Sequence, residues 1–141
     1  CEVEGNAPFD KGVLAERMVE EMLPAIESSA GGQFNFNVVN CDRSIGARVS
    51  GEIARRYGNL GMEAHPVVMN LTGTAGQSLG VWNAGGLHIR LEGDANDYVG
   101  KGLSGGTVIV NAPNEEREQE IIAGNVSFYG AVMGDIGFQV M

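Results

Sequence analysis

The sequence predicts a mainly β fold in which short strands wind as a parallel β-helix, a single-stranded solenoid, after an N-terminal helix. The first observation is a pair of similar stretches, residues 79–91 and 99–111, in which glycine recurs at matched positions twenty residues apart. The second is that a short alternating apolar run follows each glycine pair. Self-similarity at a short fixed period is typical of repeat architectures, whose units close a core only by stacking on their neighbours.

The matched glycines are predicted to be structural. Glycine reaches a positive φ without a Cβ penalty, which permits a tight corner, and it allows stacked backbones to approach closely. Gly105 in particular is predicted to sit at a corner with positive φ. A glycine-rich all-β domain built from hairpins is the alternative. The predicted structural glycines are Gly80, Gly85, Gly86, Gly100, Gly102, Gly105 and Gly106.

Residues 10–29 are predicted to form a helix that begins at Asp10 as its N-cap. Pro24 should break or kink this helix, and the residues after position 29 should end it. Residues 34–38 then alternate apolar and polar side chains, as a half-buried strand does. The apolar positions of the helix form one rough stripe, made of Val13, Leu14, Met18, Met22 and Ile26.

A second helix is predicted between residues 42 and 57, because apolar side chains recur there every four residues. Gly46 and Gly51 weaken its first part, and Gly58 offers a stop. A strand at 67–69 leads into the glycine repeats. We therefore expect a single domain over residues 1–141, with a helix–strand–helix lead-in at 10–62 and glycine-rich coils at 66–141. An imperfect further copy of the repeat is expected at 125–134.

Charge and composition exclude some functions. The chain has 141 residues and a net charge of −9, which argues against nucleic-acid binding because phosphate contacts need a basic face. Two cysteines make no disulfide framework. The acidic run at 114–120 reads as a solvated loop. We see neither a signal peptide nor an eighteen-residue apolar run, so no membrane contact and a cytoplasmic location are expected.

We expect no catalytic, cofactor-binding or metal-ligating residue in this chain. Residues 100–105 match G-x-G-x-x-G, but a nucleotide fingerprint must open a helix and here a strand pattern follows. Cys1 could be an N-terminal nucleophile, yet neighbouring acidic residues oppose thiolate formation, and we interpret it as a fragment boundary. His65 and His88 are isolated, with no ligand partner in sequence.

One polar cluster and one tryptophan are candidates for contact with another domain. Asp94, Asn96, Asp97 and Lys101 form the most polar cluster within the repeats. A catalytic role would need a partner base or a metal; turn chemistry, in which side chains bond nearby backbone amides, is the favoured alternative. A third interpretation is that these residues face a partner domain. Trp82 stands where the second stretch has a glycine, so its side chain should point outward and contact a partner.

Four blocks carry a resemblance to a known family. Residues 40–59, 72–80, 91–106 and 124–131 resemble the GXGXG domain of glutamate synthase, in order and without large gaps. The resemblance implies a right-handed parallel β-helix at the C-terminal end of the large subunit. It implies partners as well: a glutaminase domain of the class II amidotransferase type and an FMN-binding synthase domain. FMN and iron–sulfur groups are expected only in those partners, and this chain alone should have no activity.

Related domains and two departures qualify this resemblance. Similar domains occur in the β-helix subunit of formylmethanofuran dehydrogenase and in N-methylglutamate synthase-like complexes, which are the alternative identities. The chain lacks the later coils of the family domain, and it has Cys41 where the family usually shows Thr or Val. We therefore expect a fragment whose last coil is open. The isolated chain should self-associate through that coil, because an uncovered coil exposes apolar interior and unpaired backbone groups.

Overall fold

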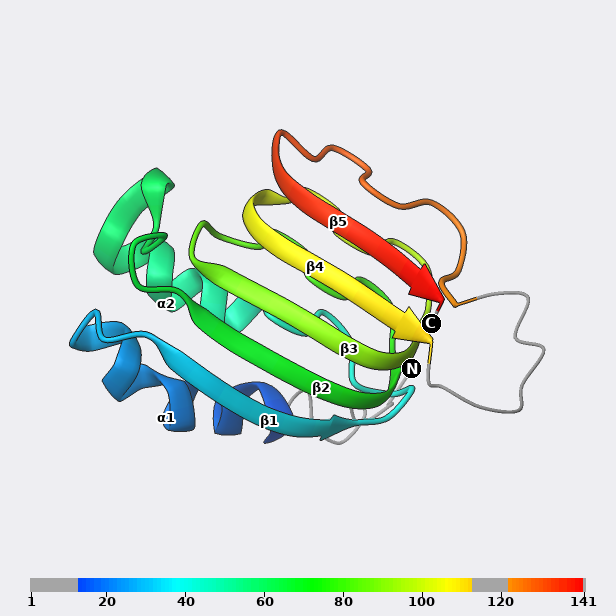
Figure 1. Ribbon diagram of the computed structural model, residues 1–141, viewed down its shortest axis with the longest axis horizontal. Coiled ribbons are helices and arrows are strands. Elements are labelled where there is room, and N and C mark those ends of the chain that lie inside the picture. The colour runs from blue at the N-terminus through cyan, green and yellow to red at the C-terminus, as the bar shows by residue number, and fades with distance from the viewer. Residues whose placement is uncertain (1–12, 113–121, 141) are drawn as a thin grey trace, which may run out of the picture.

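Five parallel strands form one sheet in the part of the chain that the computed structural model describes, residues 13–112 and 122–140. Each strand pairs with the next along the chain, in the order β1-β2-β3-β4-β5. Figure 1 shows the strands side by side, with the helices behind them. The predicted mainly β fold agrees with this architecture. The elements are α1 (Val13–Glu27), β1 (Gly32–Val38), α2 (Ala47–Tyr57), the 3-10 turn η1 (Gly58–Leu60), β2 (Val67–Ala75), β3 (Leu87–Ala95), β4 (Ser104–Ala112) and β5 (Met133–Val140).

Rows of apolar side chains run across the strands and form the core. Met69 of β2 pairs with Ile89 of β3, which pairs with Val108 of β4, and all three are fully buried. Alternate residues point to opposite faces of a strand, so in-register parallel pairing places apolar side chains beside apolar side chains on one face of the sheet. The rows that flank this one behave in the same way. The alternating apolar pattern thus places the buried face of the sheet as predicted.

The predicted period of twenty residues is kept by β2 and β3 but not by β4. Val67 pairs with Leu87, a separation of twenty, whereas His88 pairs with Thr107, a separation of nineteen. The register of β4 against β5 also shifts between Ser104 and Thr107. The change lies within β4 itself: from Ser104 to Thr107 the chain advances three residues, whereas the paired segment of β5 advances two, from Met133 to Asp135.

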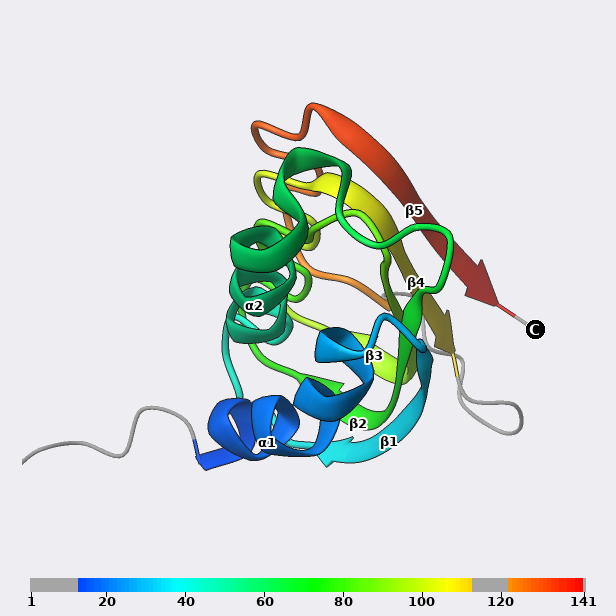
Figure 2. The same ribbon diagram turned by 90° about the vertical axis from the view of Figure 1, so that its left-hand side faces the viewer.

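Helix α1 lies at the β1 end of the sheet, as Figure 2 shows. Met18, Met22 and Ile26 are buried, whereas Val13 is 67% exposed. Pro24 was predicted to break or kink the helix, and it does not break it, because α1 runs through it to Glu27. The missing N–H of Pro24 removes one helical hydrogen bond, and its carbonyl still accepts the Ser28 N–H at 3.1 Å. The predicted cap Asp10 and the acidic run 114–120 lie outside the described residues.

Helix α2 begins at Ala47, five residues later than the earliest predicted start. Ser44 and Gly46 have φ values of 53° and 95°, which a helix cannot contain. Val49 and Ile53 are buried on the predicted face. Gly58 ends the helix at φ 64°, and its N–H bonds to the Ala54 carbonyl, which confirms the predicted stop.

Short turns stack on the far side of the core, opposite the sheet. We call residues 44–47, 78–83, 98–103 and 126–131 the crossover turns, and each crossover turn with the strand that follows it one repeat. Backbone bonds join equivalent positions of neighbouring repeats: the Gly100 N–H donates to the Leu79 carbonyl at 2.8 Å, and the Phe128 N–H to the Val99 carbonyl at 3.0 Å. Both walls of the core are therefore held by backbone hydrogen bonds between repeats.

Every second residue of a crossover turn has a positive φ. In the turn at 78–83 the Val81 N–H bonds to the Ser78 carbonyl and the Asn83 N–H to the Gly80 carbonyl, both at 3.2 Å. A positive φ at the third residue of such a turn is the signature of type II geometry. The pattern is not confined to glycine. It comprises Ser78, Gly80 and Trp82, then Tyr98, Gly100 and Gly102, then Val126, Phe128 and Gly130.

Gly105 is required for a different reason from the one predicted. It does not have a positive φ, although its neighbour Gly106 does, at 69°. A Cβ on Gly105 would lie 2.6 Å from the backbone nitrogen of Gly85. Close approach of two repeats, rather than a left-handed corner, therefore demands glycine at this position.

Candidate interaction surface

Trp82 occupies a backbone conformation that suits glycine better. Its φ is 52°, and the equivalent position of the next repeat holds Gly102. Holding a bulky residue there costs of order 1–3 kcal/mol. The indole is 63% exposed and covers Gly102, because a Cβ on that glycine would lie 2.7 Å from Trp82 Cδ1. The strain places a large apolar side chain at the surface.

Lys101 lies beside Trp82, between two tyrosines. Its Nζ is 5.4 Å from the ring centroid of Tyr98 and 5.9 Å from that of Tyr129. The two rings meet edge to face at 6.3 Å. Such contacts hold an ammonium group by cation–π attraction. We call Trp82, Tyr98, Lys101 and Tyr129 the aromatic surface.

Backbone bonds fix the aromatic surface across three repeats. The Trp82 N–H donates to the Lys101 carbonyl at 2.9 Å, and the Gly102 N–H to the Tyr129 carbonyl at 2.8 Å. Tyr98 has a φ of 64°, so it shares the strained conformation of Trp82. Tyr98 and Tyr129 were missed in the sequence, although each occupies a crossover-turn position within the repeats.

The other three members of the predicted polar cluster do not gather around Lys101. Each bonds to a residue distant in sequence, and none of these bonds is the local turn bond expected of it. They hold successive turns of the chain together. The interface role predicted for them stays a prediction. The bonds run from Thr74 Oγ1 to Asp94 Oδ1 at 2.7 Å, from the Asn125 N–H to Asp97 Oδ1 at 2.6 Å, and from Asn96 Nδ2 to Asn40 Oδ1.

A buried asparagine, not anticipated from the sequence, also joins two repeats. Asn83 is fully buried. Its side-chain Nδ2 donates to the Leu87 carbonyl at 2.8 Å and to the Gly105 carbonyl at 2.9 Å, while its backbone carbonyl accepts the Ser104 N–H at 3.0 Å. Leu103 holds the equivalent place in the next repeat. The sequence did contain a sign of this role, because Asn83 is polar at a repeat position where the next repeat has an apolar residue.

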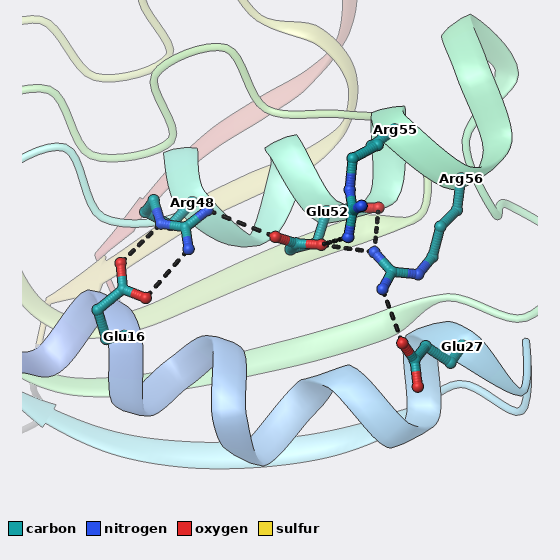
Figure 3. A network of polar contacts seen from close by, with 6 residues as sticks. All are labelled: Glu16, Glu27, Arg48, Glu52, Arg55 and Arg56. Atoms are coloured by element: carbon teal, nitrogen blue, oxygen red, sulfur yellow. Dashed lines mark hydrogen bonds and ion pairs between the residues drawn. The ribbon is translucent and has the colours of Figure 1, made fainter.

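Six charged side chains connect α1 to α2 (Figure 3). Glu52 is the centre of this network, and hydrogen bonds from Arg55 and then Arg56 lower its pKa to about 2. The Arg48 guanidinium lowers the pKa of Glu16 in the same way, with Nε–Oε1 at 2.7 Å. The contacts lie at the surface, where ion pairs are worth little individually. The members are Glu16, Glu27, Arg48, Glu52, Arg55 and Arg56.

An open cavity of about 480 Å³ lies at the start of β3, β4 and β5. His88 is in its wall, whereas His65 is not. Within the described residues, no three His, Cys, Asp or Glu side chains come close enough together to hold a metal ion. No helix in the same residues is both long and apolar enough to span a bilayer. The lining residues are Glu63, His88, Gly105, Gly106, Thr107, Met133, Gly134 and Asp135.

Comparison with known proteins gives one consistent result. The model of the GXGXG motif family matches residues 15–140. Ferredoxin-dependent glutamate synthase 2 of Synechocystis is 39% identical over 139 residues, which cover 95% of this chain and 9% of that protein. The glutamate synthase [NADPH] large chain of Azospirillum brasilense is 41% identical over 140 residues, 96% of this chain and 9% of that one.

A fungal relative extends the comparison. The glutamate synthase [NADH] of Schizosaccharomyces pombe is 40% identical over 124 residues, which are 86% of this chain and 6% of that protein. The chain thus spans less than a tenth of the length of these curated relatives. The resemblance expected from the four sequence blocks is confirmed.

Proposed function

This chain belongs to the GXGXG motif family, and we propose that it serves as the non-catalytic assembly domain of a glutamate synthase-type enzyme. The observation that carries the proposal is the similarity to glutamate synthases along most of the chain, at 39–41% identity in the three relatives described above. The reaction of the whole enzyme would form glutamate from glutamine and 2-oxoglutarate. In this proposal a glutaminase part and an FMN-binding synthase part carry out the chemistry, and this chain joins them.

The proposed architecture of the domain is a right-handed parallel β-helix. Two features support it: sheet neighbours follow chain order, and the crossover turns stack with the same backbone bonds from one repeat to the next. Stacked repeats give a rigid body whose shape is set by close contacts between adjacent units. A rigid body of that kind suits a part that holds two catalytic domains at a fixed separation.

The names of the relatives also support a role away from the electron donor. One is named for ferredoxin, one for NADH and one for NADPH, and their identities to this chain differ by only two percentage points, from 39% to 41%. A segment that selected the donor should resemble one group more than the others. The similarity fits a part that all three kinds of enzyme need for the same purpose.

Reconstitution tests the assembly role. The chain would be mixed with the glutaminase and FMN-binding synthase polypeptides from the same genome, and complex formation measured by sedimentation. We expect a complex, and glutamine-dependent glutamate formation only when the chain is present. Gly105→Val, which forces the crowded repeats apart, is the control and should lose both.

Activity of the chain by itself provides the opposing test. We expect neither glutamine hydrolysis nor flavin-dependent turnover from the purified chain. Glutamine hydrolysis that disappears in Cys1→Ala would overturn the non-catalytic proposal, because Cys1 would then be the nucleophile of the preparation.

A further inference from the structure

We propose that the aromatic surface is the docking site for a polypeptide of a partner domain, and that this polypeptide presents a carboxylate to Lys101 and an apolar side chain to Trp82. The inference rests on the proposed assembly function and specifies where and by what chemistry the partner binds. It depends on three observations: retained backbone strain, exposed aromatic area, and an isolated positive charge.

The strain at Trp82 does not serve the fold. Gly102 fills the equivalent position of the next repeat, and Gly130 that of the repeat after it, both with positive φ. A glycine would meet the same backbone requirement without strain. Strained residues that persist where a relaxed one would suffice point to a functional demand on the side chain. Here the side chain is an exposed indole.

The composition of the surface is that of a protein interface. Trp82 and Tyr129 are each 63% exposed, and Tyr98 is 36% exposed. Tryptophan and tyrosine are enriched among the residues that dominate binding energy, because they bury a large area with few rotatable bonds. The backbone bonds between repeats hold these side chains in place before a partner arrives. A preorganised aromatic surface loses little conformational freedom on binding.

Lys101 determines the charge of the partner. Among the described residues it forms no ion pair, and its ammonium group is held against two ring faces. An ammonium group has three N–H donors, so donors remain for an acceptor from outside. A carboxylate would complete the site. The net charge of −9 argues against a nucleic acid or an anionic membrane as the occupant, since binding either needs an extended basic face.

Cross-linking tests the contact directly. The chain has two lysines, Lys11 and Lys101, and a carbodiimide joins an amine to a carboxylate only at contact distance. In the complex with the glutaminase and synthase polypeptides, we expect Lys101 to couple to an Asp or Glu of one of them, identified by mass spectrometry. Lys101→Arg should abolish the cross-link yet change the Kd less than threefold, because the charge is kept.

Binding of matched variants completes the test. Trp82→Gly and Lys101→Glu should each weaken the Kd by about tenfold or more. The Trp82→Gly chain should unfold at a urea concentration no lower than the parent, since the strain is relieved. An unchanged or higher urea midpoint would show that Trp82→Gly weakens binding without unfolding the chain.

Three results would overturn the inference, and they are distinguishable. If the chain binds neither polypeptide, the proposed function fails and the inference with it. If all variants bind equally and Lys101 is not cross-linked, the assembly role stands and the partner docks elsewhere. If Lys101 couples to a carboxylate of a second copy of this chain, the aromatic surface is a contact between copies.

Discussion

The contact between Gly105 and Gly85 allows a sharp test of how closely the repeats stack. In Gly105→Ala the new Cβ would lie 2.6 Å from the Gly85 nitrogen and 2.7 Å from its Cα, where ordinary contact begins at 3.4 Å. The atoms it meets belong to the backbone, which cannot turn aside as a side chain can. The two repeats must therefore separate by about 0.8 Å, the difference between 2.6 and 3.4 Å.

The size of the effect follows from the bonds that this separation stretches. Asn83 bridges the same two repeats twice: its side-chain Nδ2 donates to the Gly105 carbonyl at 2.9 Å, and its backbone carbonyl accepts the Ser104 N–H at 3.0 Å. Both would lengthen beyond hydrogen-bonding distance. Each buried group left without a partner costs about 1–3 kcal/mol. Because the chain can relax in part, we expect a total loss of about 3 kcal/mol.

Urea denaturation followed by circular dichroism is the assay. With a slope of about 1–3 kcal/mol per molar urea, the midpoint should fall by roughly 1–3 M. Gly51→Ala is the matched control, because Gly51 lies within α2 with no atom within 4 Å of an added Cβ. It should gain up to about 1 kcal/mol from helix propensity. An unchanged midpoint in Gly105→Ala would refute the close stacking described for these repeats.

Three further predictions concern charge, a buried amide and association. The pKa of Glu52, lowered from 4.5 to about 2, contributes stability that is fully present above pH 4.5 and is lost as the pH falls toward 2; the difference in urea midpoint between the parent and Glu52→Gln should shrink over that window. A constant difference would contradict it. Asn83→Leu should cost about 2 kcal/mol or more, since two buried carbonyls lose their donor; a thermal scan that shows no loss would refute the bridging role. The isolated chain should dimerise at low micromolar concentration through the exposed apolar residues Val132, Met133 and Phe138; sedimentation of Met133→Glu should show more monomer, and a parent chain that is already monomeric would contradict this.

Periodicity predicted the second helix and the strands of the glycine repeats. The reason is that alternation and glycine spacing are local properties that survive in one sequence. The buried faces of β3 and of α2 lie where these patterns place them. The one-residue change of register within β4 was hidden, because a matched Gly-Gly pair looks the same whether the residues that follow it are shifted or not.

The conformations and contacts of the aromatic surface and the polar cluster could not be predicted, because they depend on contacts between residues far apart in the sequence. A bulky residue rarely has a positive φ, so none was expected for Trp82 or Tyr98. The backbone hydrogen bonds between neighbouring crossover turns impose it. Asp97 bonds to a residue 28 positions away, whereas turn chemistry suggested a partner within a few residues. Pro24 was expected to interrupt α1 because of the general behaviour of proline in helices, but the helix tolerates the loss of one backbone hydrogen bond and continues to Glu27.

The pairing of each strand only with its neighbours in the chain also bears on how the molecule folds. Pairing partners in β2, β3 and β4 lie about twenty residues apart, so each closing loop is short and its entropic cost is small. Parallel sheets usually form slowly because their strands are distant in sequence. This sheet avoids that difficulty, since structure can spread from any one repeat to the next. Helix α1 covers the first strand (Figure 2), so growth that starts at β1 begins on a surface that is already covered and can proceed one repeat at a time toward β5.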